Sequence, residues 1–450
     1  MEKLFGTDGV RGVANTELSP EKAMKIGCAG AYALAGQLGR PPKILIGTDT
    51  RISADMLEAA LIAGLCSVGA HVSVAGVIPS PAMAFLVRHY KMDAGVMLSA
   101  SHNPMPDNGI KFFNSKGCKL SDEVEEEIEA LIWERYDSIP RPTGAGVGRV
   151  SHTENKATED YISFLESTFA EKQPLKGLRV ALDCANGATG TAAPIIFEKL
   201  GAKIFPMHYK PNGININDGC GSTHLESIRE YVKANNVDIG LAFDGDGDRV
   251  LGVDDKGEEF DGDVIMAVCG LAMLKNGKLN NKTIVSTVMS NLGLEQFCER
   301  EGIKLLRTDV GDRYVMEEMV AGGHNLGGEQ SGHIILYDYN STGDGILTGL
   351  HLLANIKAAG LKMSDLRKAM VTLPQVLLKA EIGKNKDYQN NPVINAAIDK
   401  ITKDLAGSGR LLVRPSGTEP IIRVMMEGKD LAEIEKTAKD LTALIEKEMQ

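Results

Sequence analysis

The 450-residue chain lacks paired cysteines, long apolar runs and an excess of positive charge. Its seven cysteines occur singly and their number is odd, which excludes a disulfide framework and favours the reducing cytoplasm. No uninterrupted apolar stretch reaches the roughly 20 residues that cross a bilayer, and the first residues lack the apolar core of a signal peptide. We therefore expect a cytoplasmic protein with no membrane partner.

A formal net charge of −11, without a basic stripe, argues against nucleic acid as a partner. Apolar residues make up 43% of the chain and charged residues 24%, which is typical of a globular protein. The length favours three or four domains. An anionic substrate would need a site made locally positive by clustered Arg and Lys side chains.

Short β-branched runs alternate with helical patterns through most of the chain. In the first third we expect a helix over 54–68 and strands at 43–47, 71–75 and 94–98. The pattern restarts later, with strands expected at 179–183, 237–243 and 283–288 and a helix at 191–200. This alternation predicts mostly parallel sheets with helices on their faces, arranged as three related α/β units.

Two further stretches punctuate the first half of the chain. An acidic segment, 122–129, predicts a helix whose N-cap is Ser121, because carboxylates suit the positive end of a helix. A segment rich in proline and glycine, 139–148, predicts a linker between domains.

The last 80 residues predict a different architecture. Helices are expected over 393–405 and from residue 431, and strands at 375–382, 411–414 and 421–427. Runs of strands and helices in this order indicate an α+β unit with an antiparallel sheet.

A candidate nucleophile lies in the turn from Ser99 to Pro104. Ser101 follows a predicted strand, and open α/β sheets bind ligands at the carboxyl ends of their strands. A serine hydroxyl needs a base or a metal to activate it, and the adjacent His102 is poorly placed as a base. No Gly-x-Ser-x-Gly elbow surrounds the serine, so a hydrolase triad is not favoured. Taken alone, such a turn is more often structural.

A loop of carboxylates alternating with glycines is the strongest single signal. The carboxylates belong to Asp244, Asp246 and Asp248. Glycine lets the backbone fold sharply, so the three side chains can converge on a hard cation such as Mg²⁺. An EF-hand beginning at Asp244 fails, because Arg249 takes the place of its glycine and Asp255 that of its glutamate. The simple alternative is a solvated acidic turn.

Three carboxylates and a phosphate would leave negative charge beyond what one dication neutralises. Arg249, Arg11 and Lys111 are the candidate cations. A lysine buried among cations has a lowered pKa and can transfer protons, whereas a surface position is an equally good interpretation of Lys111.

Two more loops carry polar groups. The loop from Arg414 to Pro420, with Arg423 beyond it, combines guanidinium forks and hydroxyls that suit phosphate. The segment 327–333 places a carboxylate, a hydroxyl and an imidazole together, as sugar-binding loops do, although alone it is an ordinary loop.

Together these residues resemble the α-D-phosphohexomutases, in particular their amino-sugar branch. The resemblance rests on LFGTDGVRG at 4–12, GVMLSASHNPMPDNGIKFF at 95–113, LAFDGDGDRVLGVD at 241–254, GGEQSGH at 327–333 and RPSGTEPIIR at 414–423, which occur in the family's order. It implies three related α/β domains with mixed sheets and a C-terminal α+β domain of the TATA-binding-protein-like type around a central cleft. The domains are expected at 1–148, 149–255, 256–370 and 371–450.

The resemblance also implies roles for individual residues. Ser101 would be the phosphoserine, and Mg²⁺ would lie between an oxygen of its phosphate and Asp244, Asp246 and Asp248. Lys111, with Arg11 and His333, would assist proton transfer and charge balance. Glu329 and Ser331 would hold the sugar ring. The non-reacting phosphate would be bound by Arg414, Ser416, Gly417, Thr418 and Arg423.

The expected activity is the interconversion of glucosamine 6-phosphate and glucosamine 1-phosphate by a monomer or homodimer. Three alternatives stay open: a mutase acting on glucose or mannose phosphates, a non-catalytic metal-binding module, and a phosphatase of the haloacid-dehalogenase type with Asp246 as its nucleophile.

Overall fold

The computed structural model describes residues 3–6, 8–383, 387–405, 407–416 and 421–449. They form two units, one of Met1–Met289 with Ile303–Lys368 and the other of Ser290–Gly302 with Ala369–Gln450. Among these residues no helix is long and apolar enough to cross a membrane. The seven cysteines all lie within the described ranges, and none of them forms a disulfide.

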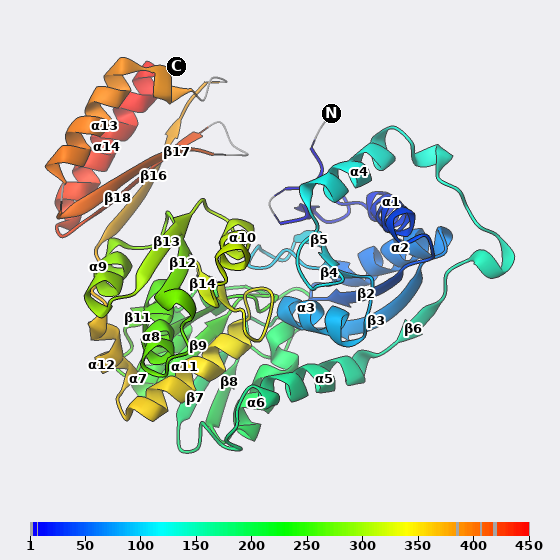
Figure 1. Ribbon diagram of the computed structural model, residues 1–450, viewed down its shortest axis with the longest axis horizontal. Helices are drawn as coiled ribbons and strands as arrows, with labels where there is room; N and C mark the ends of the chain where they lie inside the picture. Colours follow the sequence, from blue (N-terminus) through cyan, green and yellow to red (C-terminus); the bar gives the residue numbers. More distant parts are fainter. Residues whose placement is uncertain (1–2, 7, 384–386, 406, 417–420, 450) are drawn as a thin grey trace. The chain divides into compact units, whose positions relative to one another are not determined.

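The first sheet has the strand order β1-β5-β4-β2-β3-β6. Its strands are β1 (Val10–Val13), β2 (Lys43–Thr48), β3 (His71–Val77), β4 (Ala94–Leu98), β5 (Asp107–Asn114) and β6 (Val150–His152). Its helices are α1 (Pro20–Leu38), α2 (Ser53–Ser67), α3 (Ser80–His89), α4 (Asp122–Trp133) and α5 (Glu154–Ser167). Helices α1, α2 and α4 cover one face and share a hydrophobic core with it, while α3 and α5 pack on the other face (Figure 1). Strand β6 carries this sheet past residue 148, where we expected the first domain to end.

The second and third sheets repeat the central part of the first. The second has the order β11-β10-β9-β7-β8 and the third β13-β12-β14-β15. Their strands are β7 (Arg179–Asp183), β8 (Lys203–Met207), β9 (Ile239–Phe243), β10 (Val250–Asp254), β11 (Glu259–Phe260), β12 (Thr283–Thr287), β13 (Lys304–Thr308), β14 (Leu326–Gly328) and β15 (Ile334–Leu336). Their helices are α6 (Ala193–Lys199), α7 (Glu226–Asn235), α8 (Gly262–Lys275), α10 (Asp312–Gly322), α11 (Gly345–Ala359) and the short α12 (Met363–Leu366).

One strand pattern is common to all three sheets. Two parallel neighbours flank a central strand, and an antiparallel strand closes one side: β5-β4-β2-β3, β10-β9-β7-β8 and β15-β14-β12-β13. The three units are therefore related, but their sheets are mixed rather than mostly parallel. Each antiparallel closure is a hairpin, and the hairpin turns after β4, β9 and β14 carry the polar loops that the sequence singled out.

The second of the two compact units, residues 290–302 and 369–450, contains an antiparallel sheet of order β16-β18-β17. Its strands are β16 (Gln375–Glu381), β17 (Gly409–Pro415) and β18 (Ile421–Gly428), with helices α9 (Leu292–Glu301), α13 (Pro392–Asp404) and α14 (Leu431–Glu448). The buried Glu427 accepts hydrogen bonds from Leu292 N at 3.1 Å and from the Arg410 guanidinium, which attaches α9 to this sheet. The predicted α+β, antiparallel architecture is confirmed.

Helix α4 begins where the acidic segment predicted it, but Ser121 makes no capping hydrogen bond with its side chain. Burial, and then the charge of Asp122, raises the pKa of Glu125 to about 7. The ionised form is therefore disfavoured in the folded state. Because the unfolded glutamate titrates near its ordinary value, stability is lost as the pH rises from about 4.5 to about 7.

We expect Glu125→Gln to raise the free energy of unfolding at pH 8 by about 1–2 kcal/mol, after allowance for partial exposure of the side chain. The gain at pH 5 is smaller. Thermal unfolding at the two pH values measures the difference. The exposed Glu126→Gln is the matched control. An equal gain in that variant would assign the effect to net charge and contradict the prediction.

Candidate active site

Ser101 follows strand β4 of the first sheet and reaches the carboxylate loop that follows β9 of the second. Its Oγ donates a hydrogen bond of 2.6 Å to Asp244 Oδ2, and the residue is only 2% exposed. The backbone of Ser101 has a positive φ of 53°, a left-handed conformation that side chains other than glycine adopt at a cost. Ser99 Oγ stabilises it by accepting a hydrogen bond of 2.9 Å from Ser101 N. The nucleophile candidate is thus held against a carboxylate 143 residues away in the sequence.

The carboxylate loop forms a cluster suited to a cation. Asp244, Asp246 and Asp248 each offer an oxygen within 4.8 Å of the others. Asp244 Oδ1 accepts hydrogen bonds of 3.1 Å from Gly247 N and Arg249 N, which folds the loop into its turn. Burial, followed by the charges of Asp248 and Asp246, raises the pKa of Asp244 well above its usual range. Like charges in such proximity favour a neutralising ion.

The donor set fits a hard dication. Among the described residues, Asp246 Oδ1 and Asp248 Oδ1 are buried and have no hydrogen-bond partner. Two orphaned carboxylate oxygens beside a third carboxylate and a serine hydroxyl are the oxygen ligands that Mg²⁺ prefers. The other Asp246 oxygen, Oδ2, is occupied: it accepts from Ser80 Oγ at 2.6 Å and from Lys111 Nζ at 2.9 Å.

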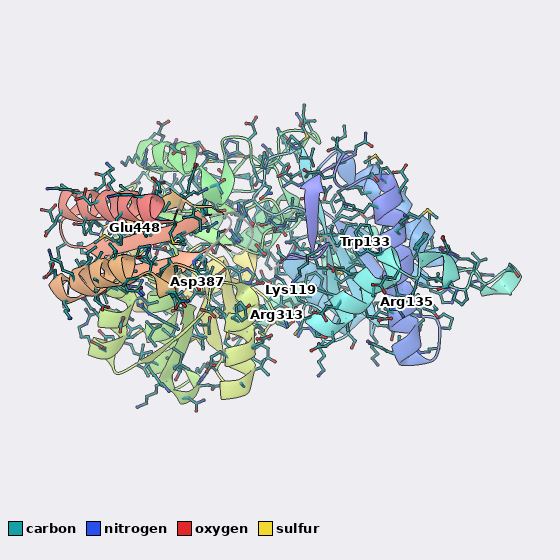
Figure 2. The ribbon with its side chains drawn as sticks, turned by 90° about the horizontal axis from the view of Figure 1, so that it is seen from above. Lys119, Trp133, Arg135, Arg313, Asp387 and Glu448 are labelled. Carbon is teal, nitrogen blue, oxygen red and sulfur yellow. The ribbon has the colours of Figure 1, made fainter. Side chains whose placement is uncertain are left out.

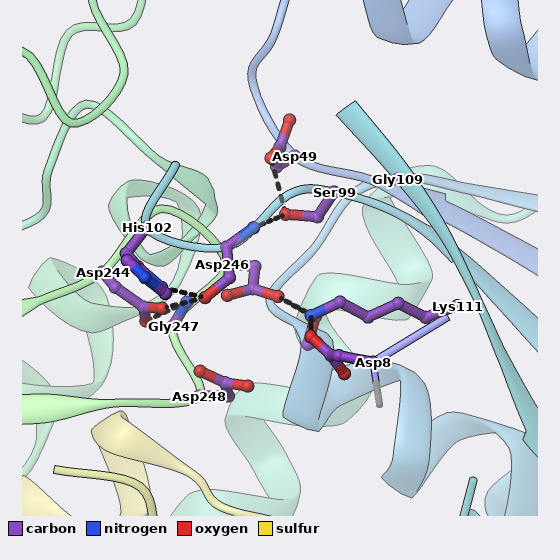
Figure 3. Close-up of polar contacts among 12 residues, drawn as sticks. Asp8, Asp49, Ser99, His102, Gly109, Lys111, Asp244, Asp246, Gly247 and Asp248 are labelled. Carbon is purple, nitrogen blue, oxygen red and sulfur yellow. Dashed lines mark hydrogen bonds and ion pairs between the residues drawn. The ribbon is translucent and has the colours of Figure 1, made fainter. Parts of the chain in front are cut away.

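The expectation of a lowered pKa for Lys111 is wrong. Burial by itself would lower the pKa of Lys111, but the charges of Asp246 and Asp8 outweigh it and the pKa is raised. The reason is that Lys111 Nζ lies 2.9 Å from Asp246 Oδ2 and 3.0 Å from Asp8 Oδ2 (Figure 3), so carboxylates rather than cations surround it. Arg11 also pairs with Asp8. In this state Lys111 is a fixed positive charge.

Arg249 and His333 lie on the other side of the carboxylate loop. Arg249 Nη1 is 3.2 Å from His102 Nδ1, and the backbones of Arg249 and His333 form a β-bridge. His333 Nδ1 is 3.5 Å from Asp248 Oδ2. Because His333 Nε2 accepts a hydrogen bond of 3.0 Å from Gly343 N, the Nδ1 proton points toward Asp248.

Two acidic residues and a lysine that the sequence analysis missed connect the first and third sheets. Lys119 Nζ lies 2.7 Å from Asp8 Oδ1 and 2.9 Å from Asp312 Oδ1. Asp312 Oδ2 is in turn 3.8 Å from His333 Nε2. Lys119 and Arg313 are found at the junction of these elements (Figure 2), where they line a cavity of about 200 Å³ together with His333. Lys119 and Asp312 stand outside the motifs, and although Asp8 lies in the 4–12 motif, nothing in that motif signalled its pairing with them.

Arg51 is the other residue that sequence reasoning missed. Its side chain is fully buried beside Asp49, with Nε 2.9 Å from Asp49 Oδ2. Its two terminal nitrogens donate to four backbone carbonyl groups in the nucleophile turn and at the start of β5, those of Ser101, Asn103, Pro104 and Asp107. Asp49 Oδ2 also accepts from Ser99 Oγ at 2.7 Å. The available signal was a charged pair directly after a buried strand.

The predicted sugar-binding loop is the turn between β14 and β15. Its Gly332 carbonyl accepts a hydrogen bond of 3.1 Å from Val250 N, which joins this loop to the carboxylate loop. Glu329 Oε1 accepts from Gly311 N at 3.2 Å. Ser331 Oγ is buried without a hydrogen-bond partner among the described residues, so its hydroxyl is available to a ligand.

The predicted phosphate-binding residues belong to the second unit. Arg414 on β17 stands directly opposite Arg423 on β18, so both side chains are on the same face of the sheet. Like charges in opposed positions are unfavourable unless an anion lies between or beside them. Ser416 is buried just beyond β17. Gly417 and Thr418 lie outside the described residues.

A serine hydroxyl directed at a carboxylate cluster from another α/β domain is the arrangement expected of an enzyme that passes phosphate through its own side chain. Models of the phosphoglucomutase/phosphomannomutase family match the chain in four segments: α/β/α domain I at 2–138, domain II at 159–257, domain III at 261–373 and the C-terminal domain at 377–444. The chain therefore belongs to the phosphoglucomutase/phosphomannomutase family.

The chain has close relatives in sequence that are named phosphoglucosamine mutase. The chain is 54% identical over 451 residues, covering all of both chains, to the phosphoglucosamine mutase of Acetivibrio thermocellus. It is 53% identical over 452 residues, again covering both completely, to the phosphoglucosamine mutase of Clostridium botulinum.

Solved structures share the fold at lower identity. A phosphoglucomutase/phosphomannomutase family protein from Burkholderia thailandensis gives a TM-score of 0.81 at 23% identity, covering 99% of this chain and 97% of that one. The Aspergillus fumigatus N-acetylphosphoglucosamine mutase, solved with GlcNAc-6P and magnesium, gives a TM-score of 0.73 at 18% identity, with coverages of 99% and 96%.

Proposed function

We propose that this enzyme interconverts glucosamine 6-phosphate and glucosamine 1-phosphate through a phosphoserine at Ser101, and so supplies a precursor of UDP-N-acetylglucosamine. The observation that carries the proposal is the 2.6 Å contact between Ser101 Oγ and Asp244 Oδ2 inside the carboxylate cluster. Full-length relatives at 52–54% identity, all named phosphoglucosamine mutase, support the amino-sugar substrate.

The reaction is written as two phosphoryl transfers. The free hydroxyl of the sugar attacks the phosphorus of phosphoserine 101, and the bond from phosphorus to Ser101 Oγ breaks. The sugar hydroxyl loses its proton, and Ser101 Oγ gains one, so that the free serine is restored. The bisphosphorylated sugar then turns over, and Ser101 Oγ takes the other phosphoryl group in the same way. Such transfers depend on positioning and charge stabilisation. Arg414, Ser416 and Arg423 would bind the phosphate that is not reacting.

Asp244, Asp246 and Asp248 would hold Mg²⁺ together with an oxygen of the Ser101 phosphate. When bound, this ion neutralises negative charge on the phosphoryl oxygens. Lys111 and Arg249 supply the remaining positive charge, and Arg11 adds to it through Asp8. Glu329 and Ser331 would hold the sugar ring, and His333, beside Asp248, would assist proton transfer and charge balance. A cytoplasmic location is consistent with seven cysteines that form no disulfide among the described residues.

The test of substrate class is the ratio of kcat/KM values for glucosamine 6-phosphate, glucose 6-phosphate and mannose 6-phosphate, measured with enzyme that is primed by a sugar bisphosphate. We expect the amino sugar to be preferred. Equal or higher kcat/KM for glucose or mannose phosphate would make the enzyme a phosphoglucomutase or phosphomannomutase instead.

Ser80 offers a milder test of the metal site. Its Oγ donates a hydrogen bond of 2.6 Å to Asp246 Oδ2. Ser80 therefore orients the Asp246 carboxylate, a proposed metal ligand, without being a ligand itself. We expect Ser80→Ala to raise the Mg²⁺ concentration for half-maximal activity by about 10-fold, because partners behind metal ligands are worth 10–100-fold in affinity. Activity at saturating Mg²⁺ should largely recover. An unchanged Mg²⁺ requirement would mean that Asp246 does not bind the ion.

A further inference from the structure

A second group of potential metal ligands lies on the second sheet, apart from the carboxylate loop. Asp183 ends β7, His208 follows β8, and Cys220 precedes a short 3₁₀ turn. Strands β7 and β8 are parallel neighbours with Asp183 paired to Met207, so their carboxyl ends bring Asp183 and His208 to one edge of the sheet (Figure 1). Each of the three residues offers a donor atom within 4.8 Å of the other two.

We propose that Asp183, His208 and Cys220 form a binding site for a transition-metal dication of the zinc class. Thiolate and imidazole ligands select such ions, whereas Mg²⁺ prefers oxygen, so the site differs in chemistry from the carboxylate loop. One carboxylate, one thiolate and a neutral imidazole balance a dication completely. That balance matters because Asp183 and Cys220 are both 0% exposed.

One Asp183 oxygen faces the histidine, and an ion bound there would take the place of the hydrogen bond that now joins Oδ2 to His208 Nδ1. Asp183 Oδ1 accepts a hydrogen bond of 2.9 Å from Ala185 N and so holds the turn after β7. Oδ2 lies 2.9 Å from His208 Nδ1 and 3.1 Å from Gly221 N, next to the cysteine. The imidazole is 31% exposed, which gives an ion and a fourth water ligand access to the cluster.

Binding requires the cysteine as thiolate. Burial, and then the negative charges of Asp183 and Asp218, raises the pKa of Cys220 to about 12, so the thiol is protonated in the absence of an ion. The ion forms a bond to sulfur, and the S–H proton leaves to solvent. The same negative charges that disfavour the thiolate attract the dication.

The site adjoins the catalytic loop through one short turn. Ala188 N donates a hydrogen bond of 2.8 Å to Gly245 O, between two of the clustered aspartates. An ion at Asp183 would therefore stiffen the turn that supports this loop. Metal binding at this site does not depend on the identity of the sugar substrate, and it can be measured directly rather than through turnover.

The experiment is a titration of the full-length protein with Co²⁺, a spectroscopic substitute for zinc, in saturating Mg²⁺. We expect a near-ultraviolet band from thiolate-to-cobalt charge transfer, which an all-oxygen site cannot give. Cys220→Ser should abolish this band. Cys184→Ser, a buried thiol one residue after Asp183, should retain it and is the matched control.

His208→Asn covers the case in which Cys220→Ser fails to fold. His208 has a positive φ of 42°, which asparagine tolerates, and the asparagine amide can still donate to Asp183. This variant should weaken Co²⁺ binding by at least about 10-fold, the lower end of what loss of even an outer partner of a metal ligand costs. Absence of the band in the wild-type protein, or a band of equal affinity in His208→Asn, would overturn the proposal.

Discussion

Ser101→Ala is expected to lower the mutase kcat by about 10⁴-fold or more, the order of effect seen when a catalytic nucleophile is removed. In the proposed mechanism Oγ is the atom that accepts and returns phosphate, and its 2.6 Å contact with Asp244 places it beside the carboxylate cluster. Alanine keeps the Cβ atom and therefore the same backbone cost at the left-handed φ of 53°. The loss should accordingly appear in turnover and not in folding.

Two measurements accompany the turnover assay. Intact-mass analysis of the primed wild-type enzyme should show one added phosphate that is absent from Ser101→Ala. The phosphate should resist hydroxylamine, since a serine ester does so and an aspartyl phosphate does not. Phosphate that hydroxylamine removes would favour the phosphatase alternative with Asp246 as nucleophile. Near-normal turnover in Ser101→Ala would end the phosphoserine mechanism.

Ser99→Ala is a useful companion because it changes a second serine in the same turn. Ser99 Oγ contacts Ser101 N and Asp49 but does not reach the carboxylate loop in any contact among the described residues. It should therefore retain the ability to become phosphorylated, with a smaller loss of kcat than Ser101→Ala.

The strands and loops of the first unit were predictable because each depends on local pattern. Strand β4 lies at 94–98 and β7 at 179–183, as expected from their apolar runs. The mixed character of the sheets was implied by the family resemblance but did not follow from the local pattern. Strands β5 and β10 return antiparallel, and an apolar strand reads alike in either direction. Pairing direction is decided by the whole sheet.

In the candidate site, too, the residues were predictable from local pattern but their arrangement in space was not. Ser101 and the three aspartates stand in compact motifs whose residue types suggest their chemistry. Their meeting, however, depends on how two domains pack, which no local pattern encodes. Lys111 illustrates the consequence: its carboxylate neighbours come from segments more than 100 residues away, so the sign of its pKa shift could not be inferred from the chain around it. The expected cleft formed by all four domains and the exact domain boundaries stay predictions.

Arg51 is the residue for which the structure adds most to the sequence, and its replacement carries the second large expected effect. All of its hydrogen bonds described above go to Asp49 or to carbonyl groups in the nucleophile turn and at the start of β5. Lysine has no planar fork and cannot satisfy these acceptors together. We expect Arg51→Lys to lower kcat by about 10²-fold and to change KM little. A displacement of reacting groups by about 1 Å has an effect of this size on kcat.

Stability and positioning can be separated by a double variant. Arg51→Met leaves Asp49 buried without its ion-pair partner and should cost about 3–5 kcal/mol of unfolding free energy. Burial already raises the pKa of Asp49 with Arg51 present, so a neutral side chain suits the site. Asp49→Asn combined with Arg51→Met should therefore recover much of the stability, measured by chemical denaturation, while kcat stays low. If kcat recovered along with stability, Arg51 would serve the fold alone. If only stability recovered, the Arg51 guanidinium would be the group that holds the Ser101 turn in its reactive geometry. The reason is that the double variant removes the buried charges but supplies no donors to the four carbonyl groups.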